Sequence, residues 1–483
     1  MAVNTWNAAV DSDGNNVGNW SLGALSSSDT LTFDATSVAA CNLSGNISCA
    51  AINITSAYSG QFDAVTHDIT TTGDITMDGT TALLMGTGSV WTCAGNWDSY
   101  HQTLTRQTSS VVMTGTTKLL QVKSGTGLYD LQISGDIAAS GLFFNLAVWN
   151  YFLVDAGKTF TAACYYGFYL RDFMSADIYG TVDISSGFKF YLRTQIDLRI
   201  KTGGRITGLG TLQTSQGSVG SQISEMAGTF DPALVIVNRG ITLTGGVYGG
   251  DWTFSQNYID KSIVLGTATS QTVEFTGDVS VDADKAGYSY TLDMATHDCD
   301  AKFSGDLTLA ASAGTLVWSE GATSVVTFDG TGTLTDNAGV GTLGDVSIEG
   351  ALTLGANAVC DDFATVSGGS FDSNGYDINS TGDMDWASGF SIVDPAGSTF
   401  DIDGNFTADT QTIVGSATWY MDIVGTAVVS GIGSVSNCDA TGTGGTEVDA
   451  SAGPWTDGLG NTNWNFGANI AIKAMHHQMQ MAL

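Results

Sequence analysis

Short runs of alternating apolar and polar residues recur along this chain, separated by turn residues. Within residues 62–77, Ile75 and Met77 point to one side of a predicted strand, and Asp74 and Thr76 point to the other. This period of two is typical of a half-buried β-strand. The Gly-Asp step before the strand predicts a turn, because Gly accepts positive φ and Asp can hydrogen-bond its own backbone.

The same sequence pattern recurs at residues 371–386. Phe-Asp, an aromatic residue or His before Asp-Ile, and Thr-Gly-Asp stand at the same offsets in both copies, and Asn374-Gly375 predicts a second turn in the unit. Such self-similarity indicates a repeat architecture. Several Gly-Asp or Gly-Asn steps lie 22 residues apart or near 40, which fits one rung of roughly 20 residues, sometimes doubled. Two spacings of 28, from Gly45 to Gly73 and from Gly277 to Gly305, predict rungs with a bulging loop.

Composition extends this pattern to the whole chain. The 483 residues include 62 Gly and only three Pro, and no Pro-rich or charge-rich linker separates independent globules. We therefore predict an all-β fold, an elongated parallel β-solenoid (β-helix) of roughly 20-residue rungs, capped at both ends, with a short C-terminal helix. The predicted divisions are an N-terminal cap (1–40), solenoid rungs (41–135), aromatic- and basic-rich wider rungs with loops (136–275), further rungs (276–450), a C-terminal cap (451–467) and a helical tail (468–483).

The two ends share a pattern that suggests capping. Asp13-Gly14 with Asn19-Trp20 has the spacing of Asp457-Gly458 with Asn463-Trp464, and an exposed end rung is an unpaired sheet edge that needs a cover. At the N-terminal end, five residues are expected to close the core: Trp6, Trp20, Leu22, Leu31 and Phe33.

The first cap also contains a weak calcium candidate. Asp11, Asp13 and Asn15 provide oxygen ligands at positions 1, 3 and 5 of a calcium loop. Gly lies at the fourth place rather than the sixth, and Leu22 replaces the bidentate Glu. A plain turn is the favoured interpretation, so we expect no required cofactor and no metal.

Residues 136–205 depart from the plain rungs. Aromatic residues crowd there, Trp149 and Tyr151 among them, with seven of the fifteen basic residues. From 189 to 201, alternation places Tyr191, Arg193, Arg199 and Lys201 on the outward face of the chain. Tyr and Arg are favoured at binding hot spots, and rings with polar groups suit sugars. These six residues are therefore our candidate binding or interface residues. Three interpretations stay open: a glycan or receptor face, a subunit interface, and a wider rung whose Lys and Arg side chains neutralise nearby Asp carboxylates.

The last 16 residues break the β pattern. Strong helix formers and Met predict a short helix, with Ile472, Met475 and Met479 on one side. Such a helix is too short to be stable alone, so we expect it to anchor the chain to a partner or to plug the last rung.

Charge and cysteine usage restrict the partners. The net charge of −33 disfavours nucleic acid, which needs clustered Lys and Arg, and no apolar run reaches the length of a membrane span. The seven cysteines are scattered and form no CxxC pair, which is typical of a reducing compartment, and Cys299 is expected to be a small core residue. The N-terminus shows no signal-peptide pattern.

Catalytic motifs do not appear in the sequence. We find no GxSxG, HExxH or P-loop, and no choice is defensible among Asp361-Asp362, Glu225, Glu274, Glu320 and Glu349 as a carboxylate pair. We therefore expect a protein that is not an enzyme and has no catalytic residues.

The repeated Phe-Asp-x-x-Gly-Tyr-Asp-Ile text, the opening Gly-Asn-Trp-Ser-Leu-Gly and the closing Gly-Asn-Thr-Asn-Trp-Asn-Phe resemble Gly-rich β-solenoid proteins of bacteriophage virions and bacterial surface adhesins. The resemblance implies a virion structural protein, a fibre, spike or decoration, that presents an elongated surface, with host-glycan adhesion as one use. The implied partners are other virion proteins, further copies of the chain and host polysaccharide, without nucleic acid or membrane insertion. The alternatives are a secreted bacterial adhesin, extracellular or on the cell surface, and a polysaccharide depolymerase spike.

Overall fold

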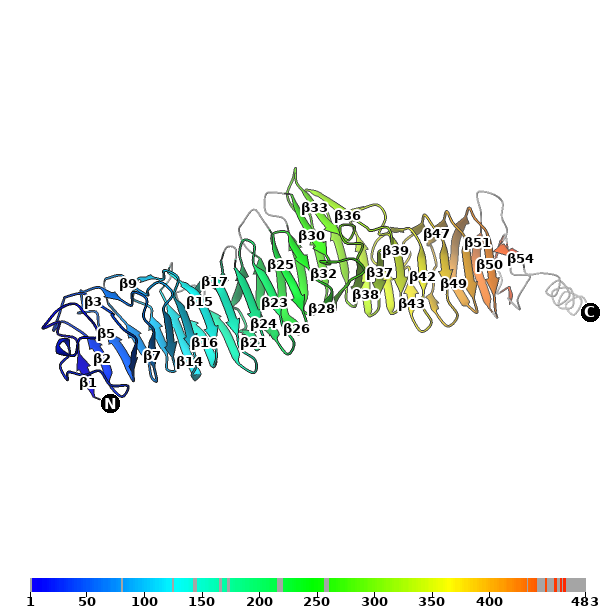
Figure 1. Ribbon diagram of the computed structural model, residues 1–483. Helices are drawn as coiled ribbons and strands as arrows, with labels where there is room; N and C mark the ends of the chain where they lie inside the picture. The colour runs from blue at the N-terminus through cyan, green and yellow to red at the C-terminus, as the bar shows by residue number, and fades with distance from the viewer. Residues whose placement is uncertain are drawn as a thin grey trace, which may run out of the picture. The chain divides into compact units, whose positions relative to one another are not determined.

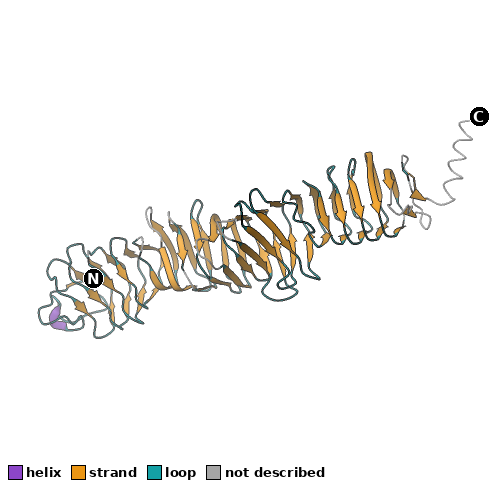
Figure 2. Cartoon of the chain, turned by 90° about the horizontal axis from the view of Figure 1, so that it is seen from above, coloured by secondary structure: helices purple, strands orange, loops and turns teal. Residues whose placement is uncertain are grey.

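The computed structural model describes residues 2–79, 81–123, 126–141, 146–164, 167–171, 174–214, 220–255, 260–431, 433–440, 448–449, 456–457, 461–462 and 464–465. They form an all-β parallel β-solenoid of about 18 turns, and about 1% of the described residues are helical. The predicted fold class is therefore confirmed, and nearly every element drawn in Figures 1 and 2 is a short strand. Residue contacts divide the chain into two units, Met1–Ile241 and Thr242–Leu483, with β27 (Ile241–Leu243) at the division.

In the first unit, parallel strands of successive turns lie in three stacks. The first stack contains β4 (Ile47–Cys49), β7 (Ile69–Thr71), β10 (Val90–Cys93), β13 (Ser110–Met113), β15 (Leu128–Ile133), the second half of β17 (Leu146–Val154), β20 (Ser175–Ile178), β23 (Asp197–Ile200) and β25 (Ser221–Met226). The second stack contains β1 (Val3–Thr5), β2 (Thr30–Phe33), β5 (Ala51–Ile54), β8 (Ile75–Met77), β11 (Trp97–Ser99), β14 (Thr116–Val122), β16 (Asp136–Gly141), β18 (Thr159–Cys164), β21 (Thr181–Ile184) and the first halves of β24 (Arg205–Thr214) and β26 (Thr229–Val237). The third stack contains β3 (Cys41–Asn42), β6 (Phe62–Asp63), β9 (Leu83–Leu84) and β12 (Leu104–Thr105), and later the first half of β17, β19 (Phe168–Leu170), β22 (Lys189–Leu192) and the second halves of β24 and β26.

The second unit repeats this arrangement with its own three stacks. One contains β28 (Gly246–Tyr248), β31 (Thr272–Phe275), β34 (Asp300–Phe303), β37 (Val325–Phe328), β39 (Asp345–Ile348), β42 (Phe363–Thr365), β45 (Met384–Trp386), β48 (Phe406–Asp409), β50 (Ala427–Ser430), β52 (Val448–Asp449) and β54 (Trp464–Asn465). Another contains β29 (Asp251–Ser255), β32 (Val279–Asp282), β35 (Leu307–Ala310), β38 (Thr331–Asp336), β40 (Ala351–Leu354), β43 (Ser370–Asp372) and β46 (Ser391–Val393). The remaining strands are β30 (Lys261–Leu265), β33 (Ser289–Asp293) and β36 (Thr315–Ser319), and then β41 (Ala358–Cys360), β44 (Ile378–Ser380), β47 (Thr399–Ile402), β49 (Thr412–Ile423), β51 (Ser434–Ala440) and β53 (Thr456–Asp457).

The strand pairing defines the length of a turn. Ile47, Ile69 and Trp91 are partners on successive turns, 22 residues apart. In the second unit Val279 pairs with Leu307, so the predicted 28-residue rung between Gly277 and Gly305 is confirmed.

The other 28-residue spacing is wrong as a measure of a turn. Gly45 precedes β4 in the first stack, whereas Gly73 precedes β8 in the second stack. Because each turn contains similar steps at more than one corner, the distance between these two glycines joins corners that do not lie above each other.

The alternation of the repeat is confirmed in the core. Ile75 and Met77 are buried, while on the opposite side Asp74 is exposed and Thr76 is half-buried. The predicted Asn374-Gly375 turn is also present, with both residues at positive φ, 51° and 79°. One inward-facing set of apolar residues per strand therefore fills a continuous interior in each unit.

The predicted positive φ is found at Gly344 (77°), but the glycine of most other Gly-Asp or Gly-Asn steps has a different role. Gly73, Gly95, Gly382 and Gly404 do not have positive φ. A Cβ on Gly95 would lie 2.2 Å from the carbonyl carbon of Gly73, and one on Gly404 would lie 2.3 Å from the carbonyl oxygen of Gly382. At Gly73, Gly95 and Gly404 the backbone of the preceding turn approaches too closely for a side chain, and at Gly382 the close neighbour is Asp362 Oδ1.

The residue after this glycine joins consecutive turns. We define the Asx ladder as the series Asp345, Asp362, Asp383, Asn405 and Thr426. In each step the side-chain Oδ1 accepts the backbone N–H of the next member, at 3.3, 2.7, 2.7 and 3.1 Å. A second series runs from Asp251 through Asp278 and Asp306 to Thr333. Asp and Asn therefore recur because each one satisfies a backbone donor of the following turn.

The N-terminal cap closes its end with aromatic rings. Trp6 and Trp20 meet edge to face at 5.3 Å, and Trp20 meets Phe33 at 5.5 Å. All three are buried, as is Leu31. Leu22 was also expected there, but it is 56% exposed, because it follows the corner that places Trp20 inside. The one described helix, the 3-10 turn η1 (Val17–Asn19), forms part of this corner.

Several further predictions concern the sulfur atoms and the C-terminal end. All seven cysteines lie in the described part of the chain, and each is buried and unpaired; Cys299 is a core residue as predicted. No helix among the described residues is long and apolar enough to cross a membrane. The helical tail with Ile472, Met475 and Met479 lies outside the described residues, as does most of the C-terminal cap.

Candidate functional site

The stretch from 189 to 201 divides between two stacks of the first unit. β22 lies in the third stack and β23 in the first, with a corner at Thr194 and Gln195, where Gln195 has a φ of 53°. Phe190, Leu192, Ile196, Leu198 and Ile200 are fully buried, so the predicted inward set holds apart from Thr194 at the corner. The outward residues do not form one stripe, because the chain turns between Tyr191 and Arg199.

On the first stack, the candidate residues surround one carboxylate. Tyr151 donates its hydroxyl to Asp177 Oδ2 at 2.5 Å, and Arg199 places Nε 2.7 Å from Oδ1 and donates from Nη2 to Oδ2 at 3.0 Å. Lys201 lies 3.8 Å from the same carboxylate and forms an ion pair with Glu225. Asp177 is only 8% exposed.

This Asp177 cluster is neutralised from within the chain. The hydrogen bond that Lys201 donates to Glu225 is the main reason that the pKa of Lys201 is raised. Burial and the bond to Asp177 also raise the pKa of Tyr151, which keeps its hydroxyl protonated. For Tyr151, Arg199 and Lys201, the geometry favours the interpretation that the bases balance local Asp.

The third stack presents a different group of side chains. The Arg–aromatic ladder is defined here as Arg106, Trp149, Tyr169, Arg171, Lys189 and Tyr191. The guanidinium carbons of Arg106 and Arg171 lie over the Trp149 ring, 4.0 and 4.9 Å from its centroid. The rings of Tyr169 and Tyr191 stack at 4.4 Å with an interplanar angle of 11°.

The strand register explains why these residues meet. Tyr169 pairs with Tyr191 in the parallel pairing of β19 with β22. Trp149, Arg171 and Arg193 each directly follow a residue of the register Val148–Leu170–Leu192, so they occupy equivalent positions on successive turns.

Two glycines make room for the large rings. A Cβ on Gly127 would lie 2.6 Å from the Ala147 carbonyl oxygen and 2.8 Å from Trp149 Nε1, and one on Gly167 would lie 2.4 Å from the Tyr191 ring. Any side chain at either glycine would push the ring away, so these glycines position the ladder.

The electrostatics of the ladder differ from those of the Asp177 cluster. Burial lowers the pKa of Arg106 and, with the neighbouring Tyr169, raises the pKa of Tyr191 to about 12. Arg106 forms no ion pair with any residue that the structure describes. Lys189 lies 5.9 Å from the Tyr191 ring and donates to Gln213 at 3.2 Å.

Sequence reasoning found part of this ladder. Trp149 and Tyr191 were predicted and belong to it, and Arg193 lies at its edge, where its carbonyl accepts a hydrogen bond from Ser221. Tyr169, Arg171 and Lys189 were visible only as members of a crowded segment. Arg106 was not among the candidate residues; the missed signal is that all six arginines of the chain lie between residues 106 and 239.

The calcium candidate forms a hydrogen-bonded corner. Asp11 Oδ1 accepts from the backbone N–H of Asp13 at 2.9 Å and from Asn19 Nδ2 at 2.6 Å. Asp13 accepts from Asn15 and Ser44, and Asn15 Oδ1 accepts two backbone N–H groups. The hydrogen bond from Asp13 is the main cause that lowers the pKa of Asp11. These bonds support the turn interpretation, and no cluster of three His, Cys, Asp or Glu suited to a metal occurs among the described residues.

Carboxylates gather at one further place, in the second unit. Burial, together with the charges of Asp361 and Asp345, raises the pKa of Glu320, whose Oε2 is buried. Asp345 belongs to the Asx ladder, and Asp361 accepts from Thr381 Oγ1 at 2.6 Å. Glu225 and Glu349 are paired with lysines. Of the acidic residues named in the sequence analysis, Asp361, Asp362, Glu225 and Glu349 therefore have structural partners, whereas the buried Glu320 Oε2 accepts no hydrogen bond from the described residues.

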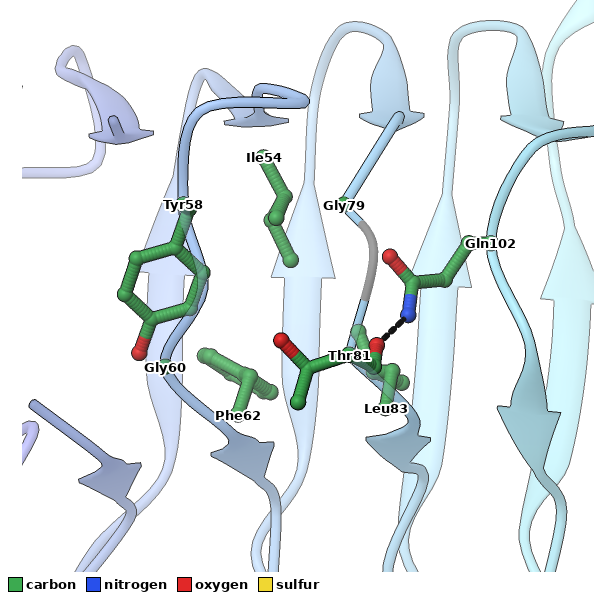
Figure 3. A pocket seen from close by; sticks show the side chains of 8 residues that line it. All are labelled: Ile54, Tyr58, Gly60, Phe62, Gly79, Thr81, Leu83 and Gln102. Carbon is green, nitrogen blue, oxygen red and sulfur yellow. Dashed lines mark hydrogen bonds between the residues drawn. The ribbon is translucent and has the colours of Figure 1, made fainter. Parts of the chain in front are cut away.

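A small hollow in the first unit is lined by apolar core residues and three polar side chains, and Thr81 Oγ1 and Gln102 Oε1 there are buried without a hydrogen-bond partner among the described residues. It is lined by Ile54, Tyr58, Gly60, Phe62, Gly79, Thr81, Leu83 and Gln102 (Figure 3). Gln102 donates from Nε2 to the carbonyl oxygen of Thr81. Tyr58 donates its hydroxyl to Ala39 O at 2.8 Å. Since most of the lining is buried core, we assign the hollow to packing between turns.

The fold and its surface groups define a parallel β-solenoid repeat protein. No family model, curated protein or solved structure matches the chain significantly.

Proposed function

We propose that this chain is a non-enzymatic structural protein of a bacteriophage virion, a fibre, spike or decoration, that presents its faces for contact with host-surface glycans. The observation that carries the proposal is the Asx ladder. Its side chains are used turn after turn as acceptors for the backbone of the next turn. The acidic residues are thus explained as scaffold, and a repetitive scaffold with one chemically distinct surface suits a protein that acts by display.

The chemically distinct surface is the Arg–aromatic ladder. It gathers cations and rings on a chain whose net charge is −33. Aromatic rings and arginines are over-represented where proteins recognise partners. The resemblance of the repeat text to virion solenoids and adhesins points the same way, and it also keeps the secreted adhesin as the main competitor.

Fractionation of a lysate of the source culture tests the proposal. Particles are separated from soluble and cell-envelope material on a density gradient, and peptides of this chain are quantified by mass spectrometry in each fraction. We expect the chain to co-sediment with particles at a fixed ratio to the major capsid protein. Enrichment in the envelope or in particle-free medium would instead support the secreted adhesin.

An assay for new reducing ends addresses the depolymerase alternative. We expect none to be released from acidic or neutral polysaccharides by the purified chain. Glu320 is the residue to test if release occurs, because a carboxylic acid with a raised pKa is the usual general acid of glycosidases. Loss of release in Glu320→Gln would then replace the non-enzymatic assignment.

A further inference from the structure

We propose that the Arg–aromatic ladder binds an anionic polysaccharide, whose carboxylate or sulfate groups pair with Arg106 and Arg171 beside Trp149. This inference rests on the proposed display function and names the chemistry of its ligand. It starts from two guanidinium groups held over one indole ring, 4.0 and 4.9 Å from the ring centroid.

The position of Arg106 is a product of the fold. Arg106 precedes β13, Gly127 lies just before β15, and Trp149 precedes the second half of β17. These three strands pair in succession, so Arg106 and Trp149 are two turns apart. Gly127, on the turn between, has no side chain to separate them, and a Cβ there would contact the indole.

Stacking prepares the arginines for an anion. A guanidinium that lies on an aromatic face keeps its N–H donors in its own plane, so they stay available to a ligand. Carboxylate and sulfate match this planar fork of donors. A ring-held side chain also loses less conformational freedom on binding than an unrestrained one.

The charge at Arg106 is not compensated by an ion pair within the described residues, although burial already lowers its pKa. By contrast, Arg199 and Lys201 are neutralised by Asp177 and Glu225. Partial burial of an unpaired guanidinium charge costs free energy, and an external anion near Arg106 would reduce that cost. In the Asp177 cluster the chain's own carboxylates already do this.

The extent of the ladder suggests a polymer. Tyr169 and Tyr191 continue it on consecutive turns, and Lys189 lies beside them. Equivalent residues of neighbouring parallel strands are about 4.8 Å apart, so donors recur along a line. Repeated anionic groups on an extended chain can engage several of these positions together.

Nucleic acid fits this surface less well than a polysaccharide. Single-stranded nucleic acid is bound by ring faces on which bases stack. Here the rings of Tyr169 and Tyr191 stack on each other with their centroids 4.4 Å apart, and the guanidinium groups of two arginines lie over the Trp149 ring. What the ladder offers is guanidinium donors held beside aromatic rings, which suit the acidic groups of sugars.

Binding to immobilised polysaccharides tests the proposal with the full chain. The probes are polygalacturonate for carboxylate, dextran sulfate for sulfate, neutral dextran and oligo-dT. We expect salt-sensitive binding to at least one anionic polysaccharide and none to neutral dextran. Arg106→Gln should weaken that binding at least ten-fold, and Arg106→Lys should restore only part of it, since Lys keeps the charge without the planar fork.

The matched control is Lys285→Gln, which removes one positive charge from the second unit and should change binding less than two-fold. Circular dichroism and thermal unfolding confirm that each variant is folded; should Arg106→Gln fail to fold, Lys189→Gln replaces it, since that side chain is exposed. The proposal is overturned if no anionic polysaccharide binds above neutral dextran, if Arg106→Gln and Lys285→Gln behave alike, or if oligo-dT is preferred. Binding by a chain absent from particles would refute the virion assignment alone, and a particle-bound chain that binds no polysaccharide would refute this inference alone.

Discussion

Asp383 and Asn405 stand at the same corner of consecutive turns, and Asp383 Oδ1 accepts the backbone N–H of Asn405 at 2.7 Å. Asn405 repeats the contact with Thr426, and Asp362 makes it with Asp383. Strand pairing alone leaves donors at the corners without partners, and these side chains supply the acceptors. Much of the acidity of the chain is therefore a property of its scaffold.

Removing one step of the Asx ladder should loosen one corner. We expect Asp383→Ala to destabilise the second unit by about 1 kcal/mol, the usual contribution of such a hydrogen bond. Asp383→Asn should cost less, because it keeps the acceptor. Hydrogen exchange is the direct readout: the Asn405 amide should exchange faster in Asp383→Ala. Asp403→Ala is the control, since Asp403 is exposed and its side chain is outside the ladder; equal protection of Asn405 in all three variants would contradict the ladder.

Whether a corner glycine tolerates substitution by alanine should depend on whether backbone or side-chain atoms of the neighbouring turn lie next to it. Gly95→Ala places a Cβ 2.2 Å from the backbone of Gly73, and we expect a loss of about 1–3 kcal/mol in unfolding free energy. Gly45 opens the same Gly-Asn step, but its nearest neighbour is the Asn15 amide at 3.2 Å, a side-chain atom. Gly45→Ala should change stability by less than about 0.5 kcal/mol. Similar midpoints for the two variants in denaturant would show that close approach is not the reason for glycine.

The seven cysteine thiols should be unreactive toward disulfide reagents in the native protein. Burial raises the pKa of Cys49, Cys164 and Cys360 to about 12, and the thiolate is the reactive form. With a disulfide reagent at pH 8, we expect no rapid reaction until denaturant is added, and then seven equivalents. One thiol that reacts rapidly under native conditions would show that the solenoid turn containing it opens to solvent.

Glu320→Gln should stabilise the protein at neutral pH. Burial and neighbouring carboxylates raise its pKa above the ordinary 4.5, so the folded state disfavours the ionised form. The gain from Gln should be full above the folded-state pKa, shrink as pH falls through it, and vanish below about 4.5. Thermal unfolding from pH 4 to pH 8 measures this.

The control for that experiment is Glu349→Gln. Glu349 lies 3.5 Å from Lys302, so its removal breaks an ion pair and should bring no gain at neutral pH. If both variants stabilise equally, general relief of the net charge, rather than the burial of Glu320, is responsible.

Chelation should leave the N-terminal cap unchanged. The oxygens of Asp11, Asp13 and Asn15 already accept protein hydrogen bonds. We therefore expect the same unfolding temperature with EDTA and with calcium. Asp11→Ala should lower it under both conditions, whereas a calcium-dependent rise in the unmodified protein would restore the metal interpretation.

The fold was predictable because its determinants are local. The alternation of Ile75 and Met77 and the Asn374-Gly375 turn follow from neighbouring residues. The reason for glycine at Gly95 was not visible, since the clash is with Gly73, one turn away. Which corners lie above each other is likewise not visible in the sequence, so the 28-residue spacing from Gly45 to Gly73 was wrongly interpreted as one turn.

The candidate site was less predictable than the fold. Alternation correctly placed Tyr191 and Arg199 outward, but no residue type in the sequence marks the corner at Gln195 that sends them to different stacks. Arg106 and Trp149 meet only because β13, β15 and β17 pair in order and Gly127 leaves a gap. A contact across two turns depends on turn length, which drifts from rung to rung.

A cryo-EM map of the native particle purified from the source culture would test directly whether this chain is displayed on a virion. We predict density for a parallel β-solenoid attached to the particle, with Arg106, Trp149 and Arg171 facing solvent. A particle without this density, or one in which a neighbouring subunit buries those three residues, would contradict the assignment of this chain as a displayed virion protein.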